Sequence, residues 1–242
     1  MQLARAYLPF LALSAVLGGA CDTSVSPITV VPSCPDMPYR DPDRYSGEDP
    51  DLLLSDFESG DNFLSKVASR DGYWVAGYDL TAKAPVAEVT KNCAARGQFA
   101  GHFSGDGYTS WWANWTAIFR DYSKTLTKTA IPYDGGGYSA VSFWAAFGSN
   151  NGPDFQVPVG IATMDTSYNG GVCLSTATCS DHYTTKVSLT HHWQRYLVSF
   201  DDMKQQGWGV PQIAMRSDQM VGFILWPKQK FDIWIDDVRF EP

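Results

Sequence analysis

The chain has 242 residues, of which 14% are aromatic, and a formal net charge of −8. This acidic balance argues against nucleic acid as a partner, because phosphates are bound by clustered Lys and Arg side chains; it is compatible with neutral glycans and bound cations. Nine tryptophans require either an aromatic-rich core or an exposed surface on which a ligand stacks.

Residues 1–20 have the composition of an export signal. A short segment with Arg5 precedes an apolar run from Tyr7 to Leu17, and small residues then lead to Cys21. The run is too short for a membrane-spanning helix, which needs about 20 apolar residues. The stretch LGGAC resembles the lipobox of bacterial lipoproteins, although Leu17 lies one position farther from the cysteine than usual. We therefore expect a lipid on Cys21 that holds the protein at the cell envelope or cell surface; cleavage before an unmodified cysteine is the alternative.

The cysteine count agrees with this expectation. Five cysteines in an exported chain leave one unpaired, and lipidation of Cys21 leaves an even number for two disulfides in an oxidising compartment. Cys173 and Cys179 flank a short Ser/Thr-rich loop, which predicts that they close it, so that Cys34 would join Cys93. Thiolate metal binding is the alternative, but no CxxC spacing favours it.

Residues 21–50 differ in composition from the rest of the chain. After Cys21 they are rich in Pro, Ser and Asp and lack apolar periodicity, which indicates a disordered tether. Residues 51–242 then form one domain, long enough for a single hydrophobic core. We expect this domain to be monomeric.

Ten short apolar or alternating runs follow, separated by clusters of Gly, Asn, Asp and Pro. Such spacing is typical of an antiparallel β-sandwich or barrel, and only DDMKQQG (201–207) could form a helical turn. The runs are LLLSDFES, YWVAGYD, GQFAGHFSG, WWANWTAIF, YSAVSFWAAFG, VPVGIATMDT, TKVSL, WQRYLVSF, QMVGFILWP and FDIWIDDVRF.

Alternation within these runs assigns their faces. In YSAVSFWAAF, Val141, Phe143, Ala145 and Phe147 share one face and point inward, whereas Trp144 lies on the opposite face. A second layer or a ligand must therefore cover Trp144.

The domain opens with LLLSDFESGDN, continues through FAGHFSGDGYTSWWANW and HWQRYLVSFDDMKQQGWG, and closes with FDIWIDDVRFEP. This order resembles the galactose-binding-like jelly rolls, and within them the family-11 carbohydrate-binding modules of secreted bacterial proteins, over roughly residues 50–242. The resemblance implies an all-β, antiparallel jelly-roll β-sandwich, a concave face or loop edge for glycan, and commonly a structural calcium ion.

The resemblance also implies where calcium would bind. Calcium prefers oxygen ligands, mostly carboxylates and backbone carbonyls, and the fold pairs its first strand with its last. The candidates are therefore Asp56 and Glu58, on one face of the first strand, and Asp236 and Asp237 in the last, with Asp106 in a loop. Solvent-facing carboxylates or turn caps are the alternative.

Sugar recognition requires flat apolar faces that stack on pyranose rings, and polar groups that bind hydroxyls in fixed directions. Trp112, Trp144 and Trp226 are our candidates for stacking, and Asp165 and Arg195 for hydroxyl recognition. Because Trp111 precedes Trp112 and the two point to opposite faces, one of them lies outside the core. Core packing is the alternative for each tryptophan; Trp115, Tyr138 and Gln194 are further candidates.

Catalysis lacks a comparable motif, since neither HExxH nor GxSxG occurs. An enzyme on this scaffold would need two carboxylates across the sugar or a base beside a cation. The candidates are Asp165 with Glu88 or Asp201 for a glycoside hydrolase, and His102, Tyr196 and Arg195 for a polysaccharide lyase. The sequence thus predicts non-catalytic polysaccharide binding by a lipid-anchored protein with a structural calcium. A polysaccharide-degrading enzyme, or an envelope domain without sugar affinity, is the alternative.

Overall fold

The computed structural model describes residues 34–35 and 49–242, except 124, 126–128, 149–154, 171–172, 174, 176–177 and 229. The expected signal peptide, Cys21 and most of the expected tether lie outside these residues. Within the described part, no helix is long and apolar enough to cross a membrane.

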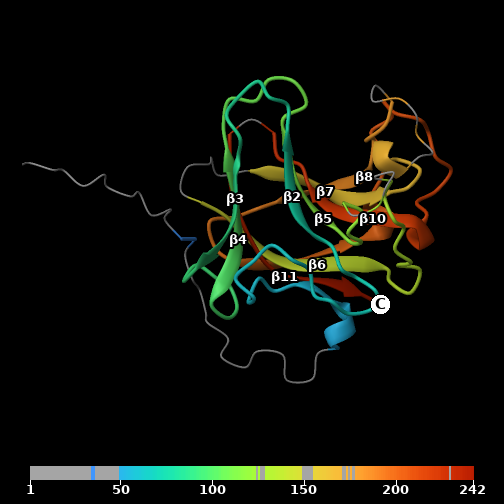
Figure 1. Ribbon diagram of the computed structural model, residues 1–242. Helices are drawn as coiled ribbons and strands as arrows, with labels where there is room; N and C mark the ends of the chain where they lie inside the picture. Colours follow the sequence, from blue (N-terminus) through green and yellow to red (C-terminus); the bar gives the residue numbers. More distant parts are fainter. Residues whose placement is uncertain are drawn as a thin grey trace, which may run out of the picture. The chain divides into compact units, whose positions relative to one another are not determined.

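The described strands form two antiparallel sheets, which lie as two layers in Figure 1. The first sheet has the order β3 (Val86–Lys91), β4 (Phe99–Gly105), β11 (Phe231–Glu241), β6 (Ala140–Phe147) and β9 (Gln194–Ser199), and β1 (Leu53–Ser55) also pairs with β11. The second sheet has the order β2 (Tyr73–Tyr78), β5 (Ala113–Ile118), β10 (Met220–Leu225), β7 (Gln156–Thr163) and β8 (Tyr183–Ser188). The predicted all-β antiparallel sandwich is confirmed.

Short 3₁₀ helices replace the expected helical turn. They are η1 (Pro50–Leu52), η2 (Tyr168–Gly170), η3 (Phe200–Asp202) and η4 (Ser217–Gln219). Of the turn expected at 201–207, only Asp201 and Asp202 are helical, as part of η3, which Ser199 caps by accepting the N–H of Asp201. Strand β3 was not among the predicted runs, because the edge strand VAEVTK is mostly exposed and packs only Val89 of its apolar side chains against the core.

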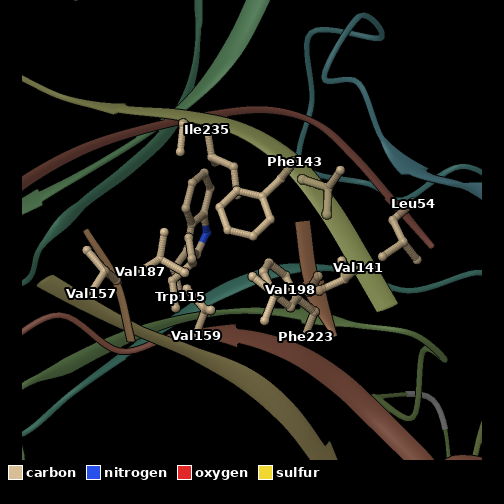
Figure 2. Close-up of a cluster of buried hydrophobic side chains, with 14 of the residues drawn as sticks. Leu54, Trp115, Val141, Phe143, Val157, Val159, Val187, Val198, Phe223 and Ile235 are labelled. Atoms are coloured by element: carbon tan, nitrogen blue, oxygen red, sulfur yellow. The ribbon is translucent and has the colours of Figure 1, made fainter. Parts of the chain in front are cut away.

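The core lies between the two sheets, as Figure 2 shows for side chains such as Phe143 and Ile235 of the first sheet and Val159 and Phe223 of the second. The inward face predicted for β6 is confirmed, since its four residues are at most 1% exposed. Burying a side chain of this size contributes about 1.5–3 kcal/mol. Aromatic contacts fill the centre, where the rings of Trp74 and Trp115 lie 4.7 Å apart.

A second buried cluster covers the outer face of the first sheet. Trp144 packs there against Trp193, Trp234 and the segment 93–95. Both predicted disulfides are confirmed: Cys34 joins Cys93, which fastens this covering segment, and Cys173 joins Cys179. The outward face of β6 is thus covered by protein.

Candidate functional site

Two adjoining cavities lie on the outer face of the second sheet and share three tryptophans. The first has a volume of about 250 Å³ and the second about 330 Å³, and Trp111, Trp208 and Trp226 line both. We call this region the tryptophan cleft. Trp111 and Trp208 are 43% and 46% exposed, which leaves large apolar surfaces available to a ligand.

The pairing of β5 with β10 places the first and third of these tryptophans together. Trp111 lies just before β5 and Trp226 just after β10, and the two strands are antiparallel, with Leu225 opposite Trp115. The indole Nε1–H of Trp226 donates to the carbonyl oxygen of Trp111 at 2.9 Å. Its backbone N–H donates to the carbonyl oxygen of Pro158 at 2.8 Å, so both ends of Trp226 are held.

The carboxylate of Asp79 organises the loop that carries Trp111. It accepts the backbone N–H groups of Ser110 at 2.8 Å and Trp112 at 2.9 Å, together with the N–H of Thr81 at 3.0 Å. These bonds hold Trp112 at a φ of 71°, which is strained for a bulky residue. Partial desolvation raises the pKa of Asp79, but the hydrogen bonds outweigh it and lower the pKa to about 2.

The buried carboxylate of Asp181 organises the loop that carries Trp208. It accepts the backbone N–H groups of Gln206 at 2.8 Å, Gly207 at 2.9 Å and Gly209 at 3.0 Å. Gly207 has a φ of +90°, and a methyl group on Gly209 would collide with the Asp181 side chain. The two glycines on either side of Trp208 are therefore needed for this loop to close on the carboxylate.

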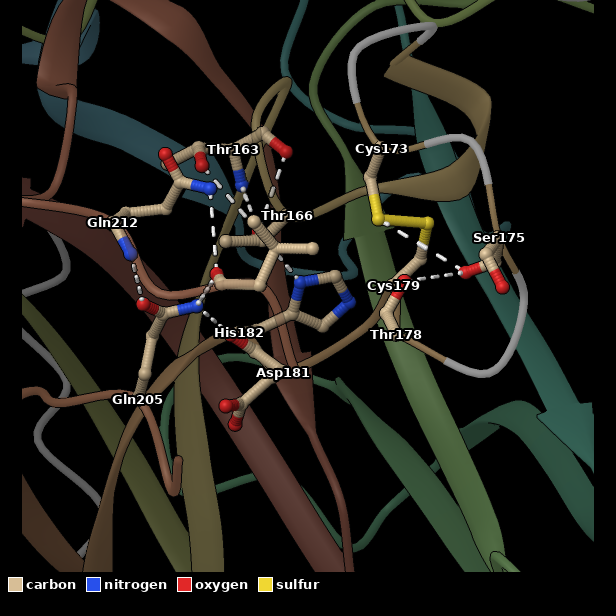
Figure 3. Close-up of a disulfide and its surroundings, with 11 residues drawn as sticks. Thr163, Thr166, Cys173, Ser175, Thr178, Cys179, Asp181, His182, Gln205 and Gln212 are labelled. Atoms are coloured by element: carbon tan, nitrogen blue, oxygen red, sulfur yellow. Dashed lines mark hydrogen bonds between the residues drawn. A yellow bond between two sulfur atoms is a disulfide. The ribbon is translucent and has the colours of Figure 1, made fainter. Parts of the chain in front are cut away.

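His182 supplies a polar group in the second cavity, with Asn114 and Ser180. Its Nδ1 lies 2.9 Å from the hydroxyl of Thr166, and Figure 3 shows this contact near the Cys173–Cys179 disulfide. Burial lowers the pKa of His182 to about 4, so its imidazole is neutral at neutral pH. A neutral imidazole has one donor and one acceptor; because Nδ1 already contacts Thr166, Nε2 is the nitrogen that could meet a sugar hydroxyl.

The predicted binding residues are divided between the two sheets. Trp112 and Trp226 line the first cavity, whereas Trp144 and Arg195 are cross-strand partners on the first sheet. Arg195 pairs with Glu241 at 2.6 Å. Asp165 lies in the turn after β7 and lines neither cavity. The structure therefore does not bring the five candidates together.

Among the further candidates, Trp115 and Tyr138 pack in or against the main core. Sequence reasoning did not select Trp111, Trp208 or His182. One signal was available for Trp208, because GWG, with a glycine on each side of an aromatic residue, is typical of a tight loop.

The residues considered for a lyase also lie apart. His102 on β4 and Arg195 on β9 are separated by β11 and β6, a distance of roughly 14 Å at normal strand spacing. His102 contacts the carboxylate of Asp232 at 2.9 Å and stacks on Trp234, with 4.2 Å between ring centroids. Tyr196 packs against the core. These side chains hold the first sheet together and do not converge on a substrate.

Two of the expected calcium ligands lie in a turn. We expected Asp56 and Glu58 on the first strand, but β1 ends at Ser55, so both residues lie beyond it. Asp56 accepts the N–H of Glu58 at 3.1 Å. Glu58 accepts the N–H groups of Gln98 at 2.8 Å and Phe99 at 2.9 Å, so its carboxylate ties this turn to the start of β4.

The other two expected ligands lie at a bulge in β11, where Asp237 has a φ of 48°. Asp237 pairs with Arg96 at 2.9 Å and with Arg239 at 2.7 Å. Asp236 accepts the backbone N–H of Arg96 at 2.8 Å. Burial raises the pKa of Asp236 well above its ordinary value, and the nearby carboxylates of Asp237 and Glu58 raise it further.

This arrangement fits a calcium ion poorly. Two guanidinium groups already neutralise Asp237, and Asp236 accepts backbone N–H groups, whereas calcium is bound by carboxylate and carbonyl oxygens that are free to coordinate it. In the part of the chain that the structure describes, no group of three or more His, Cys, Asp or Glu side chains could hold a metal ion. Calcium stays a prediction without a matching set of donors.

No protein-family model matches the sequence, and no curated protein matches it significantly. Among solved structures, the family 11 carbohydrate-binding module of the cellulosomal cellulase Lic26A-Cel5E of Clostridium thermocellum is 14% identical over 78% of this chain and 92% of that chain, with a TM-score of 0.50. The family 11 module from the same organism in complex with a β-1,3-1,4-mixed-linked tetrasaccharide is 12% identical over 78% and 94%, with a TM-score of 0.50. A family 30 carbohydrate-binding module is 12% identical over 78% and 86%, with a TM-score of 0.51. At such low identity the likeness establishes the fold alone.

Proposed function

We propose that this carbohydrate-binding-module-like jelly roll binds a polysaccharide, without cleaving it, at the tryptophan cleft. The observation that carries the proposal is the convergence of Trp111, Trp208 and Trp226 on two adjoining cavities. Flat apolar walls with a few directed polar groups are what a sugar chain requires. The solved modules of similar fold support the proposal, and one of them holds a mixed-linked tetrasaccharide.

The cleft is held in place before any ligand arrives. Asp79 and Asp181 each fasten one tryptophan-bearing loop through backbone N–H groups, and the Trp226 indole bonds to the first of these loops. A site ordered in this way loses little conformational entropy on binding. The polar groups of Asn114 and His182 lie in the same cleft and would bind sugar hydroxyls.

Affinity electrophoresis tests this proposal. The exported protein with Cys21→Ser, which cannot be lipidated, is run in gels that contain single polysaccharides, both neutral and acidic. We expect retardation by at least one polymer, and Trp226→Ala or Trp208→Ala should each weaken it by about 2 kcal/mol, roughly thirtyfold in dissociation constant.

Trp144→Ala is the matched control, because Trp144 packs on the first sheet and its loss should leave binding intact. No retardation across a broad panel would contradict the proposal. Release of new reducing ends or unsaturated uronates would instead favour the polysaccharide-degrading enzyme.

The lipid anchor is a second part of the proposal. The stretch LGGAC supports it, as does the pairing of the other four cysteines in two disulfides, which leaves Cys21 as the odd one. A lipid on Cys21 would hold the domain at the cell envelope, as a monomer. Labelled palmitate should enter the membrane-bound wild-type protein, and Cys21→Ala should release an unlabelled protein into the soluble fraction. Labelling of the Cys21→Ala protein would rule out this anchor.

A further inference from the structure

Carboxylates are unevenly distributed between the two sheets. The chain contains 26 Asp and Glu residues, yet none occurs in the five strands of the second sheet, β2, β5, β10, β7 and β8. The strands of the first sheet contain Glu88, Asp232, Asp236, Asp237 and Glu241. The face that bears the tryptophan cleft is thus free of acidic strand residues in a protein whose net charge is −8.

The charged side chain that lines the first cavity belongs to a lysine, and a second lysine lies on the same face of the sheet. Lys228 lines this cavity, and its ammonium group lies 4.2 Å from the ring centroid of Trp112, a cation–π contact that holds the charge at the cavity wall. Lys186 lies directly opposite Pro158 in the pairing of β8 with β7. Directly opposite residues point to the same face of a sheet, and Pro158 lines the first cavity. Both lysines are exposed.

The acidic side chains nearest to the cleft are directed elsewhere. Asp79 accepts backbone N–H groups of the loop before β5, and Asp181 accepts those of the loop around Trp208. Neither residue lines a cavity, and neither cavity has an Asp or Glu among its lining residues. Among the lining side chains, the first cavity thus has one positive charge, that of Lys228, and the second has neutral polar groups.

From this charge pattern we propose that the polysaccharide is acidic, and that a uronate carboxylate binds in the first cavity beside Lys228 and Lys186 while a neighbouring sugar occupies the second. This inference rests on the proposed function and names its ligand class. The strongly acidic surface as a whole repels polyuronates, so the two lysines provide the local attraction. The pyranose ring of the uronate would stack on the exposed indoles.

A matched pair of polymers tests the inference. Polygalacturonate and alginate are each compared with their carboxyl-reduced forms, in which –CH₂OH replaces –COO⁻ on the same backbone, and mixed-linkage β-glucan serves as a neutral reference. We expect an acidic form to be bound more tightly than its reduced form, with a preference that declines as salt is raised. Lys228→Gln and Lys186→Gln should each weaken binding of the acidic form by about two- to fivefold, and by more than they weaken binding of the reduced form.

Lys91→Gln is the control for net charge, because Lys91 lies on β3 of the first sheet. Equal binding of acidic and reduced forms, or equal losses from Lys91→Gln and Lys228→Gln, would overturn the inference and leave polysaccharide binding standing. Tighter binding of dextran sulfate than of either uronate, with no effect of the two cleft lysines, would overturn it as well. If no polymer binds at all, the proposed function itself is wrong.

Discussion

The indole Nε1–H of Trp226 donates a 2.9 Å hydrogen bond to the backbone carbonyl oxygen of Trp111. This bond joins the end of β10 to the loop before β5, and so connects two walls of the tryptophan cleft. It therefore links two segments that are far apart in the sequence and that must act together on one ligand.

Replacing Trp226 by Phe isolates the contribution of this bond. The Trp226→Phe protein keeps an aromatic face but has no donor for the Trp111 carbonyl, so we expect polysaccharide binding to weaken by about 1 kcal/mol, roughly fivefold. The loss should be smaller than in Trp226→Ala. Trp193→Phe is the control, because the Trp193 Nε1 has no hydrogen-bond partner among the described residues. Equal retardation of the Trp226→Phe and wild-type proteins would show that the bond does not shape the cleft.

Asp181→Asn tests how the Trp208 loop is held. The carboxylate accepts three backbone N–H groups, whereas an amide has one acceptor oxygen and adds two donors that face other donors. We expect the free energy of unfolding in urea to fall by about 2 kcal/mol, and polysaccharide binding to weaken together with it. Asp202→Asn, an exposed change in η3, should alter neither quantity. Unchanged binding by the Asp181→Asn protein would mean that Trp208 does not depend on this clamp.

Asp79 makes the other loop sensitive to acid. Its pKa is lowered to about 2 in the folded protein, below the ordinary value of about 3.9. The contribution of the carboxylate to loop order is therefore complete above pH of about 4 and is lost as pH falls through about 2. Tryptophan fluorescence of the wild-type protein should change over this range, whereas that of the Asp79→Asn protein should not. A separate variant, Asp106→Asn, is the control, because it removes a carboxylate from the loop after β4 and should titrate like the wild type. A wild-type titration identical to that of Asp79→Asn would contradict this assignment.

The carboxylates around the β11 bulge yield a prediction about cations. Arg96 is half-buried beside the buried Asp237, with side chains 11% and 1% exposed. Arg96→Gln therefore leaves the buried Asp237 carboxylate with Arg239 as its guanidinium partner. We expect a loss of about 3 kcal/mol in the free energy of unfolding.

Because the arginines already neutralise Asp237, a chelator should leave the midpoint of thermal unfolding of the wild-type protein unchanged. A midpoint that falls on chelation and recovers with calcium would show instead that the predicted metal site exists.

Alternation along strands predicted what depends on local sequence. It assigned Val141, Phe143, Ala145 and Phe147 to the core, and it placed Trp144 on the outward face. It could not show that residues 93–95 cover Trp144, because that contact depends on chain segments far apart in the sequence. The resemblance correctly paired the first strand with the last, but the bulge at Asp237 changed the surroundings of its acidic residues.

The cleft was predicted only in part, for a related reason. Trp226 is the first residue after the regular strand β10, and the sequence indicated it as a candidate for stacking. Alternation along a strand would place Trp111 and Trp112 on opposite faces. It does not apply here, because the backbone of Trp112 has a positive φ and is not extended. Trp208 lies in a loop whose path is set by Asp181, and no periodic pattern predicts a path of that kind.

The Cys34–Cys93 disulfide determines how the domain would bear mechanical load. A pull on any residue before Cys34 passes through the sulfur atoms into the connection between β3 and β4, because this covalent route bypasses a separation of 59 residues. The tension then falls on a hairpin with six residue pairs in register, instead of on β1, which has two. While the disulfide is intact, β1 is shielded from force. Under reducing conditions the same pull would reach β1 first and peel it from β11.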